Sequence, residues 1–314
     1  MTHPHLLDVQ GLNVGFRTKH GLVQALSDAT FHVDPGETLV IIGESGSGKT
    51  VMAHALMRML PMNASVSGSV RLSGSELLSC SERDMQRVRG RKMALIPQGA
   101  GSALNPVRKV GGLMLEMARA RGLKGPEARE RLEAVLGELG LAWEAVADRY
   151  PHQLSGGMQQ RVVNALALVG NPDVVIADEP THGLDPDLVD TTADQLRKIP
   201  ERDAALLVIT HDLRLAQRLG GRVALIYASY VVELRSSEAF FERPAHPYGR
   251  ALLGALPERG GVAIPGLPVE LTQLPPGCAF ASRCTDRMDE CSQSVPALLP
   301  VNDGAGSARC FLHA

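Results

Sequence analysis

A glycine-rich run near the start of the chain constrains the fold more than any other feature. It fits the pattern G-x-x-x-x-G-K-[ST], follows an apolar segment at residues 38–42 and precedes a helical segment at residues 50–60. Its glycines let a backbone wrap around phosphate with inward N–H groups, and the helix offers its positive N-terminal end. The lysine carries a charge for the phosphates, and the threonine offers a hydroxyl to magnesium. The predicted phosphate-binding residues are Gly43, Glu44, Ser45, Gly46, Ser47, Gly48, Lys49 and Thr50.

Composition narrows the class of protein. The chain has 314 residues, of which 44% are hydrophobic and 21% charged, as in ordinary globular proteins. A formal net charge of -2 and an aromatic content of 4% argue against a nucleic-acid partner, which favours basic surfaces and stacking rings. No apolar run reaches the roughly 18 residues that cross a bilayer, and residues 1–7 lack the pattern of a secretory signal. We therefore expect a cytosolic chain.

Short apolar segments recur along the chain and predict buried strands of a parallel sheet. They occupy residues 38–42, 174–177, 205–209 and 223–227, after two half-buried strands at residues 9–16 and 29–33. Helical stretches at residues 188–198 and 213–219 lie between the later strands. Residues 112–141 have a helical pattern, with an apolar stripe that runs from Leu132 to Leu139. Alternating strands and helices indicate an α/β fold.

Two carboxylates follow the strand predicted at residues 174–177. Asp178 and Glu179 end this apolar run in the manner of a Walker B motif. Such an aspartate holds magnesium, and the glutamate polarises the attacking water as a general base. Because many strands end in acids, the pattern depends on the phosphate loop that precedes it in the chain. Together the two motifs predict hydrolysis of a nucleoside triphosphate.

The segment from Leu154 to Arg161 reads Leu-Ser-Gly-Gly-Met-Gln-Gln-Arg. It resembles the signature of the ABC ATPase family, which begins with LSGG and continues with glutamine and arginine. Generic P-loop kinases and GTPases have no such segment. Ser155, Gly156 and Gly157 open a helix that can receive a γ-phosphate. The resemblance implies that this phosphate is bound to the opposite subunit of a dimer.

Further family elements occur in order along the chain. The resemblance implies that Gln98 senses magnesium and the attacking water, and that His211 contacts the γ-phosphate. Asp185 lies at the D-loop position, and Phe16 is the candidate for the ring that stacks on adenine, although it could equally be a core residue of its strand. The predicted catalytic residues are Glu179, His211 and Gln98. The predicted magnesium ligands are Thr50, Gln98 and Asp178.

The end of the chain is rich in proline, glycine and cysteine and predicts a small irregular extension. Residues 243–253 and 274–284 resemble the C-terminal region of the oligopeptide/dipeptide/nickel importer ATPases, where in some members four cysteines hold an iron–sulfur cluster. The spacing here is C-x5-C-x6-C-x18-C, without the C-x-x-C pairs of most zinc ribbons, and Cys80 stands apart. Thiols in a reducing compartment favour metal over disulfides. The predicted ligands of a [4Fe–4S] cluster, or of zinc, are Cys278, Cys284, Cys291 and Cys310. Unliganded structural thiols are the third alternative.

These motifs predict a P-loop NTPase (RecA-like) fold of the ABC type. Residues 1–243 are expected to form the ATPase domain, with a helical subdomain at about residues 99–165, and residues 244–314 the extension. The resemblance implies ATP and Mg²⁺, two transmembrane permease subunits, an extracytoplasmic substrate-binding protein, and a second related ATPase or a second copy of this chain. The chain would then act peripherally at the cytoplasmic face of the cell membrane and power uptake of di- or oligopeptides.

Two other functions remain open at this point. Residues 100–103 resemble nickel-type importers about as well as peptide-type ones, so nickel or a metal–chelator complex is an alternative cargo. A soluble ABC ATPase outside transport is an alternative of another class. Such proteins carry two cassettes or a long coiled-coil insertion. This chain has one cassette, and only about 55 residues separate Gln98 from the signature.

Overall fold

The computed structural model describes residues 5–19, 21–183 and 186–314, and these form two compact units. The first unit comprises Met1–Asp34, Thr38–Ser79 and Thr210–Ala314, and the second comprises Pro35–Glu37 and Cys80–Ile209. The C-terminal extension thus belongs to the same unit as the glycine-rich loop. The domain boundary expected at residue 243 falls inside this unit and stays a prediction.

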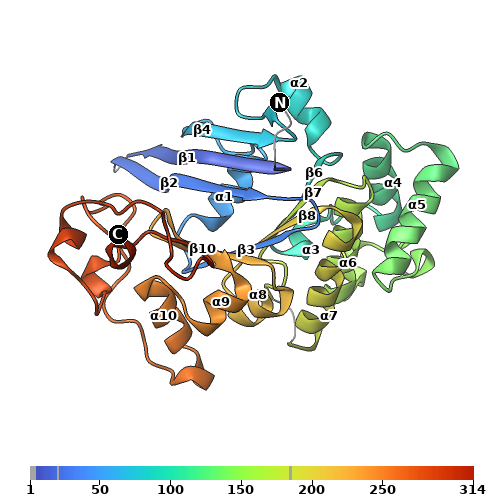
Figure 1. Cartoon of the computed structure of the whole chain (residues 1–314). Helices are drawn as coiled ribbons and strands as arrows, with labels where there is room; N and C mark the ends of the chain where they lie inside the picture. The colour runs from blue at the N-terminus through green and yellow to red at the C-terminus, as the bar shows by residue number, and fades with distance from the viewer. Residues whose placement is uncertain (1–4, 20, 184–185) are drawn as a thin grey trace. The chain divides into compact units, whose positions relative to one another are not determined.

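A mixed sheet forms the framework of the first unit, with the strand order β5-β4-β1-β2-β10-β9-β3 (Figure 1). Its strands are β1 Leu7–Thr18, β2 Gly21–Val33, β3 Thr38–Gly43, β4 Ala64–Leu72, β5 Ser75–Glu76, β9 Arg222–Tyr227 and β10 Tyr230–Ser236. β1 pairs antiparallel with β2 and β4, whereas β3 runs parallel to β9. Residues 39–42 are completely buried, as expected for an apolar run inside a parallel sheet. The helices of this unit are α1 Lys49–Leu56, α8 Leu213–Leu219, α9 Ser237–Glu242 and α10 Pro247–Gly254.

The C-terminal extension is hydrogen-bonded to this sheet. Its strands are β11 Leu299–Pro300 and β12 Gly306–Ala308. β12 pairs antiparallel with β10, so that Ala308 lies opposite Glu233. The backbone N–H of Gln24 on β2 also donates to the carbonyl of Leu271, at 3.0 Å. In Figure 1 the orange and red end of the chain accordingly runs beside β2 and β10.

The second unit combines three parallel strands with six helices among its described residues. Its elements are α2 Glu82–Val88, β6 Met93–Ile96, α3 Ala100–Ala103, α4 Val110–Ala120, α5 Gly125–Glu138, α6 Gly156–Leu168, β7 Val174–Asp178, α7 Pro186–Arg197 and β8 Ala205–Thr210. The strand order is β8-β7-β6, and both pairings are parallel. The predicted α/β class is confirmed.

One predicted helix is wrong in its extent. Residues 112–141 do not form a single helical stretch, because α4 ends at Ala120 and α5 begins at Gly125. Gly122 between them has a φ of +98°, a conformation that only glycine adopts readily. The apolar stripe itself is confirmed, since Leu132, Val135 and Leu136 are fully buried. The break divides the stretch into two helices.

Candidate functional site

The glycine-rich loop leaves β3 at Gly43 and enters α1 at Lys49, as the sequence predicts. Two of its glycines, Gly46 and Gly48, have φ values of +79° and +106°. A Cβ atom on Gly48 would lie 2.1 Å from the carbonyl oxygen of Ala25. This distance is too short for any real Cβ atom. The loop therefore packs against β2 so closely that this position requires glycine for space as well as for conformation.

Lys49 lies inside the loop and not on the surface. The residue is 6% exposed, and Nζ donates to the carbonyl oxygens of Gly43 and Glu44 at 2.8 and 2.9 Å. Thr50 follows it in the first turn of α1 and is exposed. The loop carbonyls thus fix the ammonium group at the centre of the curved backbone, where it can attract a phosphate.

The predicted signature forms the start of α6. Ser155 is the N-cap of this helix, and its Oγ accepts the backbone N–H of Met158 at 3.3 Å. Gly156 has open space around its Cα, whereas Gly157 packs against the side chain of Leu188. Arg161 donates to the carbonyl oxygens of Gly157 and Gly140. The segment therefore presents an exposed, capped helix N-terminus, a favourable position for an anion.

The two carboxylates follow one another at the end of β7. Asp178 is 3% exposed as the last residue of the strand. Glu179 has a φ of +47°, which is costly for a residue with a side chain, and its backbone N–H donates to Ile209 on β8 at 2.8 Å. The backbone turn therefore separates a buried carboxylate from a half-exposed one. Such an arrangement can give two adjacent acids different tasks.

The remaining predicted residues are distributed over both units. Gln98 is exposed between β6 and α3 in the second unit, and His211 is exposed after β8. Phe16 lies on β1 opposite Val23 of β2 and is half-buried, so its ring is partly accessible. Asp185 lies outside the described residues. The structure brings together residues 43–50 within the first unit and residues 178–179 within the second.

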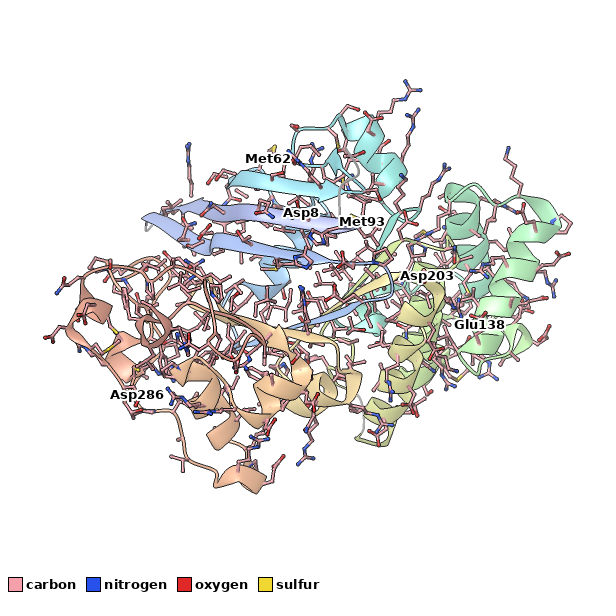
Figure 2. All side chains as sticks on the ribbon, viewed as in Figure 1. Asp8, Met62, Met93, Glu138, Asp203 and Asp286 are labelled. Atoms are coloured by element: carbon pink, nitrogen blue, oxygen red, sulfur yellow. The ribbon has the colours of Figure 1, made fainter. Side chains whose placement is uncertain are left out.

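Four thiols converge in the extension. Cys278, Cys284, Cys291 and Cys310 line one cavity together with His246. Burial raises the pKa of Cys278 to about 11, and it also raises those of Cys284 and Cys310. None of the four forms a disulfide in the structure. The carboxylate of Asp286, at the edge of the extension in Figure 2, also lines this cavity and pairs with Arg250 at 2.6 Å.

His246 was not among the predicted site residues, although it lies in a quoted motif. Burial lowers the pKa of its imidazole to about 3, so the ring is neutral. Nδ1 accepts the backbone N–H of Tyr248 at 3.0 Å, which places the ring proton on Nε2. Nε2 is buried and has no partner in hydrogen-bond geometry, although the Arg309 backbone lies near the ring. A buried N–H donor thus belongs to the wall of the thiol cavity.

Arg283 is a second residue that the sequence reasoning missed. Its guanidinium forms an ion pair with the carboxylate of Glu44 in the glycine-rich loop, with the closest atoms 3.1 Å apart. The sequence context indicates that Arg283 is buried but does not identify its partner. Arg283 lies within the mainly apolar segment 277–284, and a buried arginine requires an anionic partner from elsewhere in the chain.

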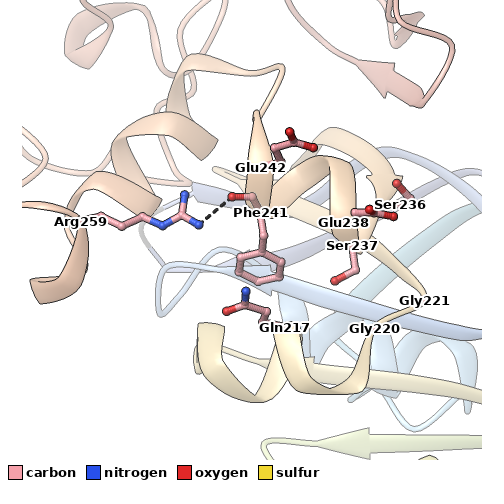
Figure 3. A pocket seen from close by; sticks show the side chains of 9 residues that line it. All are labelled: Gln217, Gly220, Gly221, Ser236, Ser237, Glu238, Phe241, Glu242 and Arg259. Atoms are coloured by element: carbon pink, nitrogen blue, oxygen red, sulfur yellow. Dashed lines mark hydrogen bonds between the residues drawn. The ribbon is translucent and has the colours of Figure 1, made fainter.

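A hollow of about 590 Å³ lies beside α8 and α9 (Figure 3). Its lining residues are Gln217, Gly220, Gly221, Ser236, Ser237, Glu238, Phe241, Glu242 and Arg259. The guanidinium of Arg259 donates to the carbonyl of Phe241 at 2.7 Å, as the dashed line shows. None of the residues predicted to bind nucleotide lines this hollow. It therefore does not belong to the predicted site.

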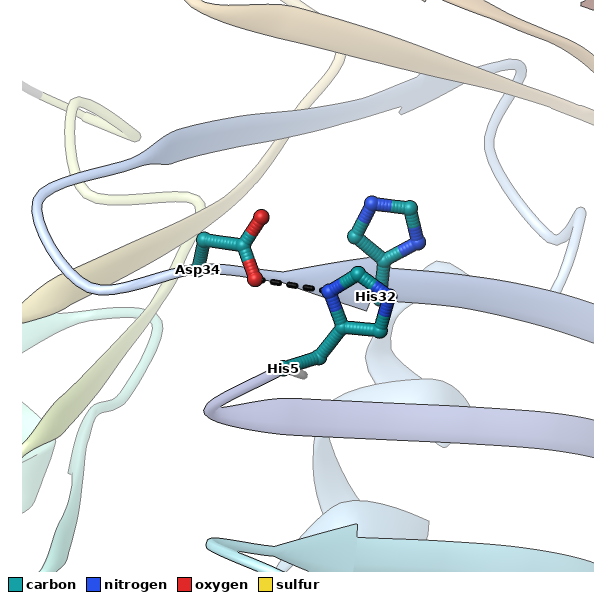
Figure 4. A group of neighbouring side chains, drawn as sticks. All are labelled: His5, His32 and Asp34. Atoms are coloured by element: carbon teal, nitrogen blue, oxygen red, sulfur yellow. Dashed lines mark hydrogen bonds and ion pairs between the residues drawn. The ribbon is translucent and has the colours of Figure 1, made fainter. Parts of the chain in front are cut away.

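A group of three potential metal ligands, His5, His32 and Asp34, lies at the start of the first unit (Figure 4). His5 Nδ1 and the Asp34 carboxylate are 2.7 Å apart, and the two imidazole rings stack at 3.7 Å. His32 Nε2 accepts from the guanidinium of Arg222 at 3.0 Å. The positive charge of Arg222 opposes a cation here, so the group is explained by its own contacts.

No helix in the described part of the chain is both long enough and apolar enough to cross a membrane.

Comparison with known proteins identifies both parts of the chain. A family model described as ABC transporter matches residues 26–182, and one described as the C-terminal region of oligopeptide/dipeptide transporters matches residues 232–291. The oligopeptide transport ATP-binding protein OppD of Bacillus subtilis (strain 168) is 38% identical, over 98% of this chain and 89% of OppD. A Brucella ovis protein named for peptide import ATP binding is 37% identical, over 99% of this chain and 98% of that protein.

Solved structures agree with this relationship. The dimeric ATP-binding cassette MJ0796, in a post-hydrolysis state with ADP and phosphate, superposes with a TM-score of 0.65 at 26% identity. The match covers 74% of this chain and 98% of that cassette. The P-loop NTPase fold expected from the sequence is thus confirmed, and the chain belongs to the ATP-hydrolysing subunits of ABC transporters, in the oligopeptide/dipeptide/nickel importer family.

Proposed function

We propose that this chain hydrolyses ATP to power the uptake of di- or oligopeptides, and that it does so at the cytoplasmic face of the cell membrane. One observation carries the proposal. A single chain joins an ABC cassette to the C-terminal region of oligopeptide/dipeptide transporters, and relatives that match nearly its whole length are named for peptide transport or import. The ATPase subunit works with two membrane permeases and an extracytoplasmic peptide-binding protein.

In this proposal the loop at residues 43–50 binds the phosphates, whereas Asp178 and Glu179 bind magnesium and activate water, respectively. Lys49 contacts the β- and γ-phosphates, and Thr50, Asp178 and Gln98 supply the oxygen ligands that Mg²⁺ prefers. Magnesium held by these residues would neutralise charge that develops on the phosphates. Glu179 accepts a proton from the attacking water, a role that its half-exposed side chain beside the buried Asp178 supports.

The remaining predicted residues act on the nucleotide from other directions. His211 contacts the γ-phosphate, and the half-buried ring of Phe16 stacks on adenine. Ser155, at the exposed N-terminus of α6, receives the γ-phosphate bound by the loop of the opposite ATPase. That opposite subunit is a related ATPase or a second copy of this chain. Asp185, at the D-loop position, is the last member of the set and lies outside the described residues.

Uptake by cells that lack the gene tests the cargo. Loss of labelled di- and oligopeptide uptake, restored by the wild-type gene but not by Glu179→Gln, is the expected result. Loss of radioactive nickel uptake with normal peptide uptake would instead assign the metal cargo. Normal uptake of both, with the protein recovered on ribosomes or DNA and not on membranes, would contradict a role in transport.

We further propose that the four thiols hold a [4Fe–4S] cluster. The residues fit such a group in two respects. The four thiols line a single cavity, and thiolates are the ligands that such clusters require. The Nε2–H of His246 is a buried donor on the wall of the same cavity, and the sulfur atoms of a cluster are acceptors for such a donor.

Metal analysis tests the thiol site separately from transport. Anaerobically purified protein is expected to be brown and to carry about four iron atoms per chain. Cys284→Ser should lose most of the iron, whereas Cys80→Ser, which changes a thiol outside the extension, should keep it. Colourless protein with one zinc per chain would show that the site binds zinc and not a cluster. Metal-free protein would show that the thiols are structural.

A further inference from the structure

The extension holds the glycine-rich loop at Glu44. The backbone N–H of Glu44 donates to the Oη of Tyr248 at 3.0 Å. The two carboxylate oxygens of Glu44 accept from the two terminal nitrogens of Arg283, at 3.1 and 3.2 Å. Both the main chain and the side chain of this loop residue are therefore fixed by residues more than 200 positions later in the sequence.

Arg283 is itself held rigidly. Its side chain is 4% exposed, its Nε donates to the carbonyl of Pro265 at 2.9 Å, and one terminal nitrogen also donates to the Oη of Tyr227 at 3.2 Å. The guanidinium lies over the rings of Tyr227 and Phe280, with its carbon 5.7 and 5.9 Å from their centroids. A planar fork fixed on several sides loses little freedom when it binds a carboxylate with both prongs.

A cluster of aromatic rings packs against the residues that contact Glu44. The rings of Tyr227, Tyr248 and Phe280 lie 4.6 to 5.4 Å from one another between centroids, and all three are buried. Tyr227 ends β9, whose residue Ile226 pairs with Gly43 at the end of β3. The partners of Glu44 thus pack against β9, the strand that pairs with the strand leading into the loop.

Glu44 connects this contact to the lysine of the loop. Its carbonyl oxygen accepts from Lys49 Nζ at 2.9 Å and from the backbone N–H of Ser47 at 3.2 Å. The orientation of the Glu44 residue therefore determines where an acceptor of the lysine lies. A displacement of the Glu44 side chain would alter both the curvature of the loop and the position of the ammonium group.

We propose that Arg283 is a positioning residue for nucleotide binding, and that the C-terminal extension completes the nucleotide site of its own chain through the Arg283–Glu44 ion pair. The proposal rests on the assignment of residues 43–50 as the nucleotide-binding loop. Arg283 does not touch the nucleotide. It acts through Glu44 on Lys49 and on the N–H groups that receive the phosphates.

Calorimetric titration of the full-length chain with ADP and magnesium tests this role. Arg283→Met is expected to weaken ADP binding roughly tenfold, because a charge-assisted contact that orders the loop is lost. Arg283→Lys keeps the positive charge but loses the planar fork of the guanidinium. Its ADP affinity should lie between those of the wild type and Arg283→Met. The control is Arg287→Met, which removes an exposed arginine of the same extension whose guanidinium donates to Ser292 Oγ, and its ADP affinity should equal that of the wild type.

The stoichiometry separates positioning from folding. A merely structural role lowers the number of binding sites per chain but leaves the affinity of the folded fraction unchanged, and this result would overturn the proposal. Wild-type affinity in Arg283→Met would overturn it as well. The double variant Glu44→Gln/Arg283→Met should bind no more weakly than the weaker single variant, whereas additive losses would show that Arg283 does not act through Glu44. If the wild type did not bind ADP, residues 43–50 would not be the nucleotide-binding loop. The present proposal would then fail together with that assignment.

Discussion

The carboxylate of Glu233 accepts the backbone N–H of His246 at 2.9 Å, and both residues are buried. Its other oxygen accepts the N–H of Ala245 at 2.8 Å, and Arg235 lies 3.8 Å away. One acid of β10 thus holds the start of the segment that leads into α10. Despite these contacts, burial raises the pKa of Glu233 to about 7.

This shift predicts a pH dependence of stability. A carboxyl with a raised pKa in the folded state contributes stability fully below its unfolded pKa of 4.5, and the contribution is lost as the pH rises through about 7. The unfolding free energy of the wild type relative to Glu233→Gln should therefore fall by about 2 kcal/mol between pH 5 and pH 8. Urea unfolding at both pH values measures it. Glu242→Gln, at an exposed position of α9, should keep the pH dependence of the wild type.

Alanine at two glycines of the loop should cost different amounts of stability. Gly48→Ala combines a left-handed backbone with a Cβ 2.1 Å from the Ala25 carbonyl, so we expect the unfolding free energy to fall by about 3 kcal/mol or more. Gly46→Ala meets no atom within 4 Å and carries only the backbone strain, about 1 kcal/mol. Urea unfolding of both variants checks the difference. Equal losses would mean that packing against β2 does not determine the cost.

Loss of the proposed general base should separate binding from turnover. Glu179→Gln is expected to bind ATP as the wild type does but to hydrolyse it at least roughly a hundredfold more slowly. The measurements are steady-state phosphate release and ATP titration. Glu201→Gln, an exposed acid of the same unit, should hydrolyse ATP normally. Undiminished phosphate release by Glu179→Gln would exclude Glu179 as the base.

Removal of the metal that we propose for the thiol cavity should weaken binding at the nucleotide site. Cys284 directly follows Arg283, so a change in the cavity moves the residue that holds Glu44. We expect chelation to weaken ADP binding of the wild type roughly fivefold. Because Arg283→Met has already lost the contact, its weaker affinity should not change further on chelation. Equal effects of chelation on both proteins would place the coupling elsewhere.

Local patterns in the sequence were sufficient for the elements whose chemistry is local. The run 43–50 lies between a buried strand and a helix because its glycines and the flanking apolar residues require it, and Ser155 caps α6 as its residue type favours. The strand expected at residues 29–33 extends back to Gly21, where alternation is weak. The helix break near Gly122 was missed although Gly122 and Gly125 mark it, because the apolar stripe that follows resembles the continuation of one long helix.

Contacts between distant segments could not be predicted in the same way. Arg283 and Glu44 are 239 positions apart, and no periodicity relates them. Asp28, which pairs with Arg309 at 2.9 Å, and Gln24, which is bonded to Leu271, lie even further from their partners. Such pairs depend on how the extension packs against β2 and β10, and a single sequence carries no signal of that packing.

The strand pairing of β12 with β10 has a consequence for how such ATPases can diversify. Genetic exchange near residue 243 would separate Glu233 from Ala308, its neighbour in the sheet, and would unite two halves that had not been selected together. In a hybrid of two paralogues, the β10 of one parent would have to pair with the β12 of the other. The contacts of the buried Glu233 and the Arg283–Glu44 ion pair would also have to form between residues of different parents. We expect the extension to be inherited with its own cassette, and not to be traded between transporters as an independent module.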